Sequence, residues 1–367
     1  MMSKEKRRVP KLRFPGFTED WEQRKFGDLF EYERPDAYIV KSDNYNNDFN
    51  MPVLTANKAF ILGYTNEENS YNKPSIIFDD FTLDRKYVDF PYMLKSSAIK
   101  ILTSKNQHNL RFLFERLNST RFEVLGHARH YISVVQNTTT LCPSIDEEVC
   151  ISNLLTKFDE LITLHQRKLD NLKLKKKALL QKLFPKNGDR YPELRFPGFT
   201  DAWEQRKFKD IAFKRGKISE ADLPYIEFED INSGIGTLNK NILQKVGHKK
   251  GILFEAGDVL FGKLRPYLQN WLLCQFMGIA VGDFWVFQPQ IVSSAFLYYL
   301  IQSEAYQSVA NISSGTKMPR SSWLLVSETQ FSIPKYKEAT MIGEFFTSID
   351  KNITLHQRKL DHLQLQK

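Results

Sequence analysis

The chain has 367 residues, 42% of them hydrophobic, which is enough apolar material for two or three packed domains and excludes a disordered chain. Its 52 Lys and Arg residues outnumber its 43 Asp and Glu residues, and the net charge of +9 is compatible with a polyanionic partner without requiring one. Three cysteines without a CxxC pair exclude a disulfide framework and a cysteine-rich zinc site. The lack of a signal peptide or membrane-spanning run predicts a cytoplasmic protein.

Two blocks of the sequence occur twice. Residues 12–29, LRFPGFTEDWEQRKFGDL, return as residues 194–211 with 14 of 18 positions identical. Residues 158–170 return as residues 349–361, with ITLHQRKLD unchanged. The inserts enclosed by these blocks have little sequence in common. A duplicated enzyme would normally keep its working residues alike, so a shared frame around different inserts indicates one scaffold that presents two different binding surfaces.

The first insert, residues 30–142, has the pattern of a mixed α/β domain. Apolar and β-branched runs predict strands at residues 51–56, 59–65, 75–80 and 97–102, and a helical pattern covers residues 110–117. A loop containing Gly126 follows and leads to a last strand. His127, Arg129 and His130 in this loop are candidate DNA-binding residues, since such donors bind phosphates and base edges, and ordinary surface charge is the alternative.

A long helix follows the first insert. From Leu155 the apolar and seam positions are spaced by alternating three and four residues over four heptads, which is the pattern of a coiled coil. The seam consists of Leu155, Phe158, Ile162, His165, Leu169, Leu172, Lys176, Leu179 and Leu183. Six basic residues lie on the outer face, where they remain solvated or contact phosphate or a partner subunit: Arg167, Lys168, Lys173, Lys175, Lys177 and Lys182. Pro185 and the Asn187-Gly188 pair are predicted to end the helix.

The second copy of the helix repeats the phase of this seam. Its seam positions are Phe346, Ile349, Ile353, His356, Leu360 and Leu363. Because His165 and His356 occupy the same seam position, we expect the two helices to pair as an antiparallel coiled coil with a polar histidine layer. A metal-binding or catalytic role for the two histidines is the alternative. A helix of residues 147–183 would be about 55 Å long, which suits a rigid spacer between two reading surfaces.

The second insert, residues 212–333, offers the same order of strands, a late helix and a Gly-bearing loop. The strand-like runs are residues 223–231, 251–261, 270–276 and 278–287, and the helix is predicted near residues 294–309. Tyr267 and Trp323 of this insert, and Tyr131 of the first, are expected to pack inside their domains.

Four further residues are candidates for DNA binding in the second insert. Lys263 and Arg265 follow Gly262, whose missing side chain would let the backbone approach DNA. Lys317 and Arg320 lie in the late loop. Each of the four would clamp a phosphate or contact guanine, and a surface salt bridge is the alternative for each.

Signatures of catalysis are missing from the sequence. Residues 257–264, GDVLFGKL, match seven positions of a P-loop, but Leu264 replaces the Ser or Thr that would hold magnesium. Asp79 and Asp80 lack accompanying metal ligands, and we expect them to be structural or to contact bases. No adenine-methyltransferase motif and no glycine-rich cofactor loop is present. We therefore expect no catalytic residue, no metal site and no cofactor.

The repeat predicts an alternating domain organisation. We expect a basic N-terminal tail, a first recognition domain, a central spacer helix, a linker, a second recognition domain and a C-terminal spacer helix. These correspond to residues 1–11, 12–143, 144–186, 187–193, 194–334 and 335–367.

The repeated LRFPGF…W and ITLHQRKLD blocks around variable α/β inserts resemble the specificity (S) subunit of type I restriction–modification systems. GDVLFGKLRPYL and SSGTKMPRSSW in the second insert are similar to segments of the target-recognition domains of that family. SIIFDDFT, KSSAIKIL and GHARHYIS in the first insert resemble a different recognition class of the same family.

This resemblance implies a non-catalytic subunit that binds double-stranded DNA. It implies that two mixed α/β target-recognition domains, separated by long antiparallel coiled-coil helices, each read half of an asymmetric two-part target. It also implies methyltransferase (M) subunits, two of them in our prediction, that methylate adenine, and restriction/motor (R) subunits. A self-contained DNA methyltransferase or nuclease with an unrecognised site is one alternative, and a stand-alone DNA-binding regulator is another.

Overall fold

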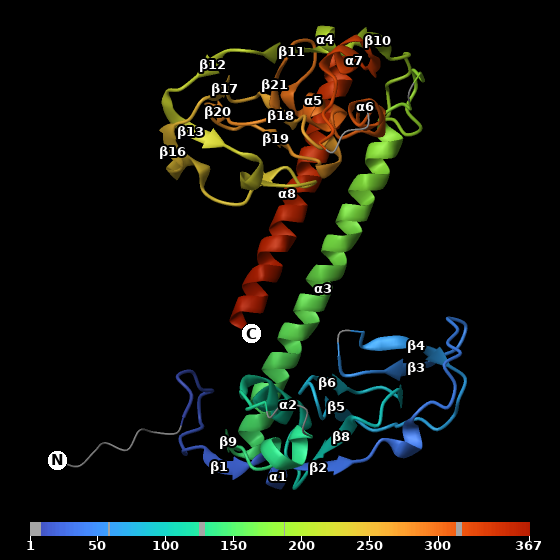
Figure 1. Ribbon diagram of the computed structural model, residues 1–367, viewed down its shortest axis with the longest axis vertical. Helices are drawn as coiled ribbons and strands as arrows, with labels where there is room; N and C mark the ends of the chain where they lie inside the picture. Colours follow the sequence, from blue (N-terminus) through green and yellow to red (C-terminus); the bar gives the residue numbers. More distant parts are fainter. Residues whose placement is uncertain (1–8, 58, 125–128, 187, 313–317) are drawn as a thin grey trace, which may run out of the picture. The chain divides into compact units, whose positions relative to one another are not determined.

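The computed structural model describes residues 9–57, 59–124, 129–186, 188–312 and 318–367 (Figure 1). The chain divides into two compact units, residues 1–161 with Lys367 and residues 162–366. The boundary falls within the longest helix, α3 (Ile145–Leu183), which begins two residues before the predicted start and ends at the predicted residue.

The repeated block builds the frame of the first unit. It forms β1 (Glu22–Lys25) and α1 (Phe26–Leu29), and β1 pairs antiparallel with β9 (Thr139–Cys142), the last strand before α3. Arg13 donates two hydrogen bonds to the buried carboxylate of Glu147 in the first turn of α3, at 2.8 and 2.7 Å. This two-pronged contact fixes the N-terminal segment on the long helix.

The first insert folds into two small sheets. An antiparallel sheet has the order β2-β8-β5-β6, and a second has the order β4-β3-β7, in which β3 and β7 are parallel. The bounds are β2 (Phe30–Glu33), β3 (Met51–Leu54), β4 (Ile61–Thr65), β5 (Ser75–Asp79), β6 (Arg85–Val88), β7 (Met93–Leu94) and β8 (Ile99–Ser104). The central strand β5 is apolar at successive positions because both of its faces are buried.

Short helical segments complete the first unit. The predicted helix is present as α2 (Leu110–Ser119), and Asn109 caps it by accepting a hydrogen bond from the Phe112 amide. A 3₁₀ turn, η1 (Asp36–Tyr38), follows β2, and a π-helical turn, η2 (Tyr131–Val135), precedes β9.

The second unit repeats the frame with the same residues in the same roles. β10 (Glu204–Lys207) and α4 (Phe208–Ile211) correspond to β1 and α1, and β10 pairs antiparallel with β22 (Gln330–Ile333). Arg195 donates to Glu338 at 2.7 and 2.8 Å, which reproduces the contact of Arg13 with Glu147. Glu338 lies in the first turn of α8 (Tyr336–Gln366).

The main sheet of the second insert has the strand order of the first, and the second sheet is larger. The antiparallel sheet β11-β21-β18-β19 matches β2-β8-β5-β6. The second sheet has the order β12-β17-β20-β13-β16, in which β16-β13-β20, with β13 and β20 parallel, matches β4-β3-β7. The bounds are β11 (Ala212–Arg215), β12 (Ile218–Ser219), β13 (Asp222–Ile226), β14 (Ile231–Asn232), β15 (Thr237–Leu238), β16 (Val246–His248), β17 (Gly251–Phe254), β18 (Val259–Gly262), β19 (Trp271–Leu273), β20 (Gly278–Ala280) and β21 (Phe284–Pro289). Two inserts with little common sequence therefore share the main sheet and three strands of the second sheet, and the second insert adds further strands.

Short helices and turns again link and cover the strands. The predicted single helix near residues 294–309 is wrong: it is two helices, α5 (Ser294–Leu300) and α6 (Glu304–Ala310). Ser303 starts the second one, because its Oγ accepts a hydrogen bond from the Tyr306 amide and caps a new N-terminus. The remaining bounds are η3 (Phe228–Asp230), η4 (Ile242–Gln244), η5 (Pro266–Leu268) and α7 (Trp323–Glu328).

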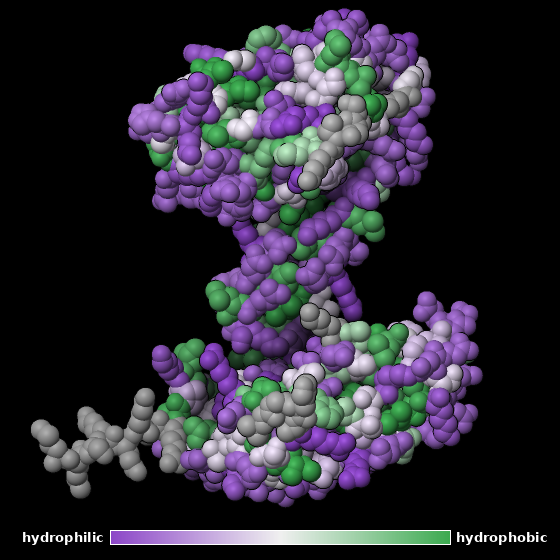
Figure 2. Space-filling model, viewed as in Figure 1, coloured by the Kyte–Doolittle hydropathy of each residue, from purple (hydrophilic) through white to green (hydrophobic). Residues whose placement is uncertain are grey.

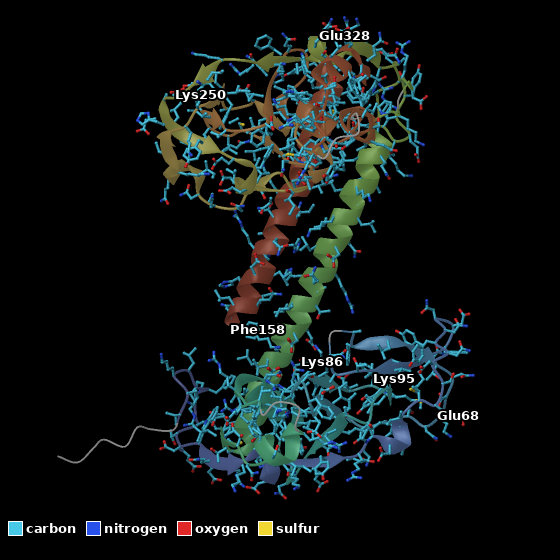
Figure 3. All side chains as sticks on the ribbon, viewed as in Figure 1. Glu68, Lys86, Lys95, Phe158, Lys250 and Glu328 are labelled. Atoms are coloured by element: carbon cyan, nitrogen blue, oxygen red, sulfur yellow. The ribbon has the colours of Figure 1, made fainter. Side chains whose placement is uncertain are left out.

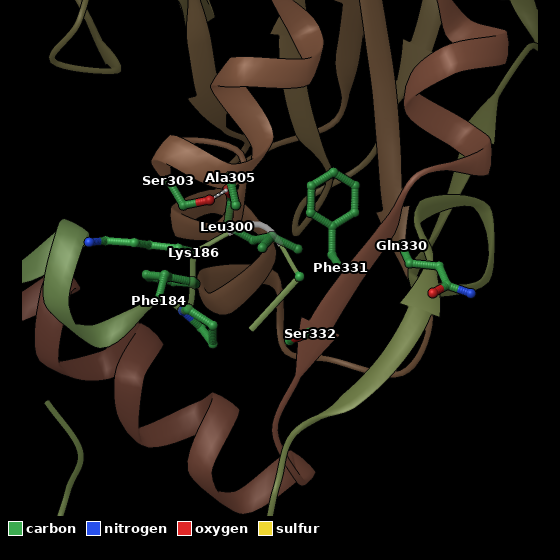
Figure 4. A pocket seen from close by; sticks show the side chains of 10 residues that line it. Phe184, Lys186, Leu300, Ser303, Ala305, Gln330, Phe331 and Ser332 are labelled. Carbon is green, nitrogen blue, oxygen red and sulfur yellow. Dashed lines mark hydrogen bonds between the residues drawn. The ribbon is translucent and has the colours of Figure 1, made fainter. Parts of the chain in front are cut away.

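The end of α3 packs on this second domain. Phe184 lies in the domain core with Trp203 and Phe296, their rings 5.4 to 6.4 Å apart. Figure 4 shows the small hollow beside it, where Ser303 Oγ donates to the Leu300 carbonyl at 2.7 Å. Its volume of about 10 Å³ leaves room for about one water molecule, so this is a packing seam and not a ligand site.

Within the second unit, α3 and α8 pair in the predicted antiparallel manner. His165 Nδ1 and His356 Nδ1 are 3.0 Å apart, and Lys176 Nζ contacts the Asp350 carboxylate at 2.7 Å. All the seam positions predicted on α3 and α8 are buried or half-buried. The histidine contact confirms the predicted polar layer. Along the helices in Figure 2, polar and apolar residues are interleaved on the visible face.

Candidate nucleic-acid interface

The structure brings two of the predicted DNA-binding segments of the second domain together. Leu264 and Arg320 form an isolated antiparallel β-bridge between the segment after β18 and the segment before α7. The Ser321 amide donates to the Lys263 carbonyl at 2.9 Å, and the Arg265 amide donates to the Pro319 carbonyl at 2.7 Å. Lys263, Arg265 and Arg320 therefore belong to one short ladder at one edge of the domain.

A carboxylate that the sequence did not single out as a site residue joins these cations. The Asp283 carbonyl accepts from the Lys263 amide, and its carboxylate contacts Lys263 Nζ at 3.4 Å and Arg320 Nη2 at 2.9 Å. Partial burial would raise the pKa of Asp283, but the hydrogen bond from Arg320 and the charge of Lys263 lower it below its ordinary value. The only hint in the sequence was a charged residue within an otherwise apolar run.

Arg265 is held in an unusual backbone conformation. Its φ of +48° is left-handed, which is costly for a residue with a Cβ, and η5 begins at the next residue. Its Nε is enclosed and has no hydrogen-bond partner in the described part of the chain. Strained residues with unused donors are found at binding sites more often than elsewhere.

The predicted role of Gly262 is wrong. Gly262 is buried, and a Cβ there would lie 2.7 Å from Phe228 Cε1 and 3.0 Å from Asn270 Cβ. The missing side chain makes room for packing inside the domain and leaves no opening for DNA.

The candidates of the first domain are not brought together in the same way. His130 is fully buried, with its Nδ1 3.0 Å from the Asp80 carbonyl, while Arg129 beside it is exposed. His127 lies outside the described residues, as does Lys317 of the second domain. The buried position of His130 serves the packing of the loop and does not present the ring to a ligand.

Asp79 and Asp80 have structural roles. This was one of the two predictions for them, the other being contact with bases. Asp79 Oδ1 accepts from the amides of Phe81 and Thr82 and so closes a turn after β5. The buried Asp80 accepts from the Tyr131 amide at 2.8 Å and lies 3.7 Å from Lys100 Nζ. No group of three or more metal-binding side chains was found in the ranges that the structure covers.

The P-loop match is not a phosphate-binding loop. In a P-loop the glycine-rich segment joins a strand to a helix, whereas residues 259–262 here form the buried strand β18. Among the described helices none is long and apolar enough to cross a membrane.

Aromatic residues divide between core and surface. Tyr131 is buried, and the half-buried Trp323 packs on Trp285 and Phe287, as predicted. The prediction for Tyr267 is wrong, because its side chain is 57% exposed in η5, beside Arg265. Sequence analysis also missed Lys214, whose Nζ lies 4.4 Å from the centre of the Trp323 ring.

Comparison with known proteins decides the family. The model of the type I restriction modification DNA specificity domain matches the chain twice, over residues 18–174 and 200–365. The chain belongs to this family. It is a DNA-recognition subunit of the type I restriction–modification class, and the chemistry of modification and cleavage is not its own.

Two specificity subunits and one solved structure are similar to the chain, with different identities and different coverage. It is 44% identical over 115 residues to the EcoR124I/EcoR124II specificity subunit of Escherichia coli, a match that spans 29% of this chain and 28% of that protein. It is 20% identical to the MjaVIII specificity subunit of Methanocaldococcus jannaschii, over 96% of this chain and 91% of that one. A crystal structure of the S subunit from M. genitalium has the same fold, with a TM-score of 0.67, 14% identity, and coverage of 97% and 96% of the two chains.

Proposed function

We propose that each recognition domain reads one half of a two-part double-stranded DNA target, and that Lys263, Arg265 and Arg320 bind DNA in the second domain. The observation that carries this proposal is the backbone ladder that holds these three residues together. Lys263 and Arg320 also form the predicted salt bridge, with Asp283, whereas Arg265 Nε has no partner among the described residues. Arg and Lys are the side chains that clamp phosphates and contact guanine in the major groove. A ladder of backbone hydrogen bonds holds them in a fixed geometry, which base recognition requires.

In the first domain the proposal rests on Arg129, which is exposed beside the buried His130. His127 and Lys317 remain candidates because of their positions in the late loops of the two domains. The domain boundaries near residues 143, 187 and 334 also remain proposals.

We further propose that two methyltransferase subunits dock on the repeated frame and that restriction/motor subunits join the assembly. The repeated frame blocks, residues 12–29 and 194–211, support two equivalent docks, because equal surfaces suit two copies of one partner. We place the complex in the cytoplasm, where its DNA target and its three free cysteines would both be expected.

Substitution at the ladder tests the function. The chain is co-expressed with its methyltransferase subunits, the methylated motif is sequenced, and binding is measured on the cognate and a scrambled duplex. If Arg265 contacts guanine, Arg265→Ala should weaken cognate binding by about 1–3 kcal/mol and relax one base position. If Arg265 contacts phosphate, binding to both duplexes should weaken equally and the salt slope should fall by about one.

Lys250→Ala is the matched control, because Lys250 is an exposed cation of the same domain, near β17 (Figure 3). It should bind both duplexes like the wild type. Unchanged binding and an unchanged motif in the double variant Lys263→Ala, Arg265→Ala would contradict the proposed site.

A further inference from the structure

A groove with lysines on one wall lies in the second unit between α3 and the recognition domain. Its volume is about 570 Å³, and α3 contributes Lys173, Lys176 and Lys177 to its wall. Gln269 and Trp271, just after η5, line the opposite side. Three ammonium groups in one groove are opposed by two carboxylates, those of Glu304 and Asp350.

Only one of the three lysines is neutralised by the fold. Lys176 pairs with Asp350 at 2.7 Å and lies over the Tyr299 ring, so its charge is used within the helix pair. The side chains of Lys173 and Lys177 are exposed and make no hydrogen bond or ion pair with any residue that the structure describes. Two cations therefore face solvent along the groove.

The lysines of this wall are only partly repeated in the second copy of the helix. At the shift of 191 residues that relates the two helices, Gln364 occupies the position of Lys173, whereas Lys367 occupies that of Lys176. A dock for two equal partner subunits would be kept alike in both copies. The difference at Lys173 indicates a contact that is used once, beside the second recognition domain.

The groove is continuous with the proposed base-reading ladder. Residues 265–269 run from Arg265 through η5 to Gln269, where φ is again left-handed at +59°. The Gly234 amide donates to the Gln269 carbonyl at 2.9 Å and fixes the chain at the groove. A duplex read by Arg265 would therefore bring its sugar–phosphate backbone toward the groove that Gln269 lines.

We propose that this groove binds the phosphate backbone of the DNA next to the half-site read by the second domain, with Lys173 and Lys177 as sequence-independent contacts. The inference rests on the proposed function. The exposed amides of Gln181 and Gln269 supply uncharged donors to the same phosphates, as is common at DNA backbones. Two of the six basic residues on the outer face of α3 thus have a proposed ligand.

The test is the salt dependence of binding by the full chain in complex with its methyltransferase subunits. Each neutralised phosphate contributes about 0.9 to the slope of log K against log salt, so Lys173→Gln, Lys177→Gln should lower the slope by about 1.8. The loss of affinity should be the same on cognate and scrambled duplexes, and the methylated motif should not change. Lys168→Gln, Lys175→Gln removes the same charge from the same helix outside the groove and should leave the slope near that of the wild type.

The outcomes separate this inference from the function on which it rests. An unchanged slope in Lys173→Gln, Lys177→Gln would overturn the groove as a phosphate site. Loss of the methyltransferase subunits with an unchanged slope would overturn it as well and would assign the groove to an acidic protein segment. Equal binding of cognate and scrambled duplexes by the wild-type complex would instead overturn the proposed function.

Discussion

Single residues repeat their roles in the two units even where their surroundings differ. Arg13 and Arg195 each hold a buried glutamate in the first turn of a long helix with two hydrogen bonds. A carboxylate at a helix N-terminus is favoured by the helix dipole. The two hydrogen bonds from the arginine offset the free-energy cost of burying the carboxylate. Trp21 and Trp203 are likewise buried in both units.

The histidine pair gives the helix pairing a pH dependence. One ring must donate and the other accept across the 3.0 Å contact, so protonating the acceptor places two donors face to face. Burial lowers the pKa of His356, and the nearby Lys168, His165 and Lys359 lower it further. Because the folded pKa lies below the ordinary value of 6.5, this stability is complete above about pH 6.5 and is lost as the pH falls through the folded pKa.

We therefore expect the wild type to lose more thermal stability between about pH 7.5 and about pH 5.5 than a variant with both histidines changed to Asn. Asn keeps a polar layer in the seam but does not titrate in this range. Circular dichroism melting of both proteins at both values measures the difference. The same loss in both proteins would show that the histidine pair contributes no pH dependence.

At the scale of elements, α3 is the part whose length has a functional consequence. Its seam residues face α8 from Ile162 onward, so residues 162–183 pair with α8 while the preceding turns belong to the first unit. If α3 sets the spacing of the two half-sites, a change in its length and a rotation of the segments that flank it should have separate effects on DNA binding.

Inserting seven residues of the same heptad pattern between Leu161 and Ile162 should lengthen the gap between half-sites by about three base pairs. Seven residues add about 10 Å and rotate the flanking segments by only about 20°. The recognised bases should not change, which sequencing of the methylated motif measures. A five-residue insertion rotates them by about 140° and should abolish methylation. A normal motif and gap with either insertion would disprove the spacer role.

For the whole molecule, the shared topology of the inserts makes them interchangeable parts. Both begin directly after the frame helix, at β2 and at β11, and both end in the strand that pairs with the frame, β9 or β22. The strand order of the main sheet is the same in both. An insert of the same topology from a relative would join the frame at the same two places, directly after the frame helix and at the strand that pairs with the frame.

Exchanging residues 212–333 for the corresponding insert of a relative should change one half of the methylated sequence and leave the other half and the gap intact. Sequencing of modified adenines in a host that expresses the hybrid measures all three. A hybrid in which both halves change would show that the domains do not read independently. Exchange for an insert of identical specificity is the control for folding.

The sequence by itself determined the features that depend on local pattern and on repetition. The duplicated blocks predicted the frame, and the three-four spacing from Leu155 predicted both the paired helices and their histidine layer, because a heptad seam is a property of neighbouring residues. Many strands of the inserts were also visible as short apolar runs. Membership of the specificity-subunit family followed from the same blocks.

Only the tertiary structure decided how distant segments combine. The common strand order of two dissimilar inserts, the ladder between Leu264 and Arg320, and the position of Asp283 between two cations all arise from pairing across long stretches of chain. The burial of His130 and the packing role of Gly262 follow from neighbours that are remote in sequence. Such contacts cannot be predicted from residue type and spacing, because the contacts depend on which surfaces meet when the chain folds.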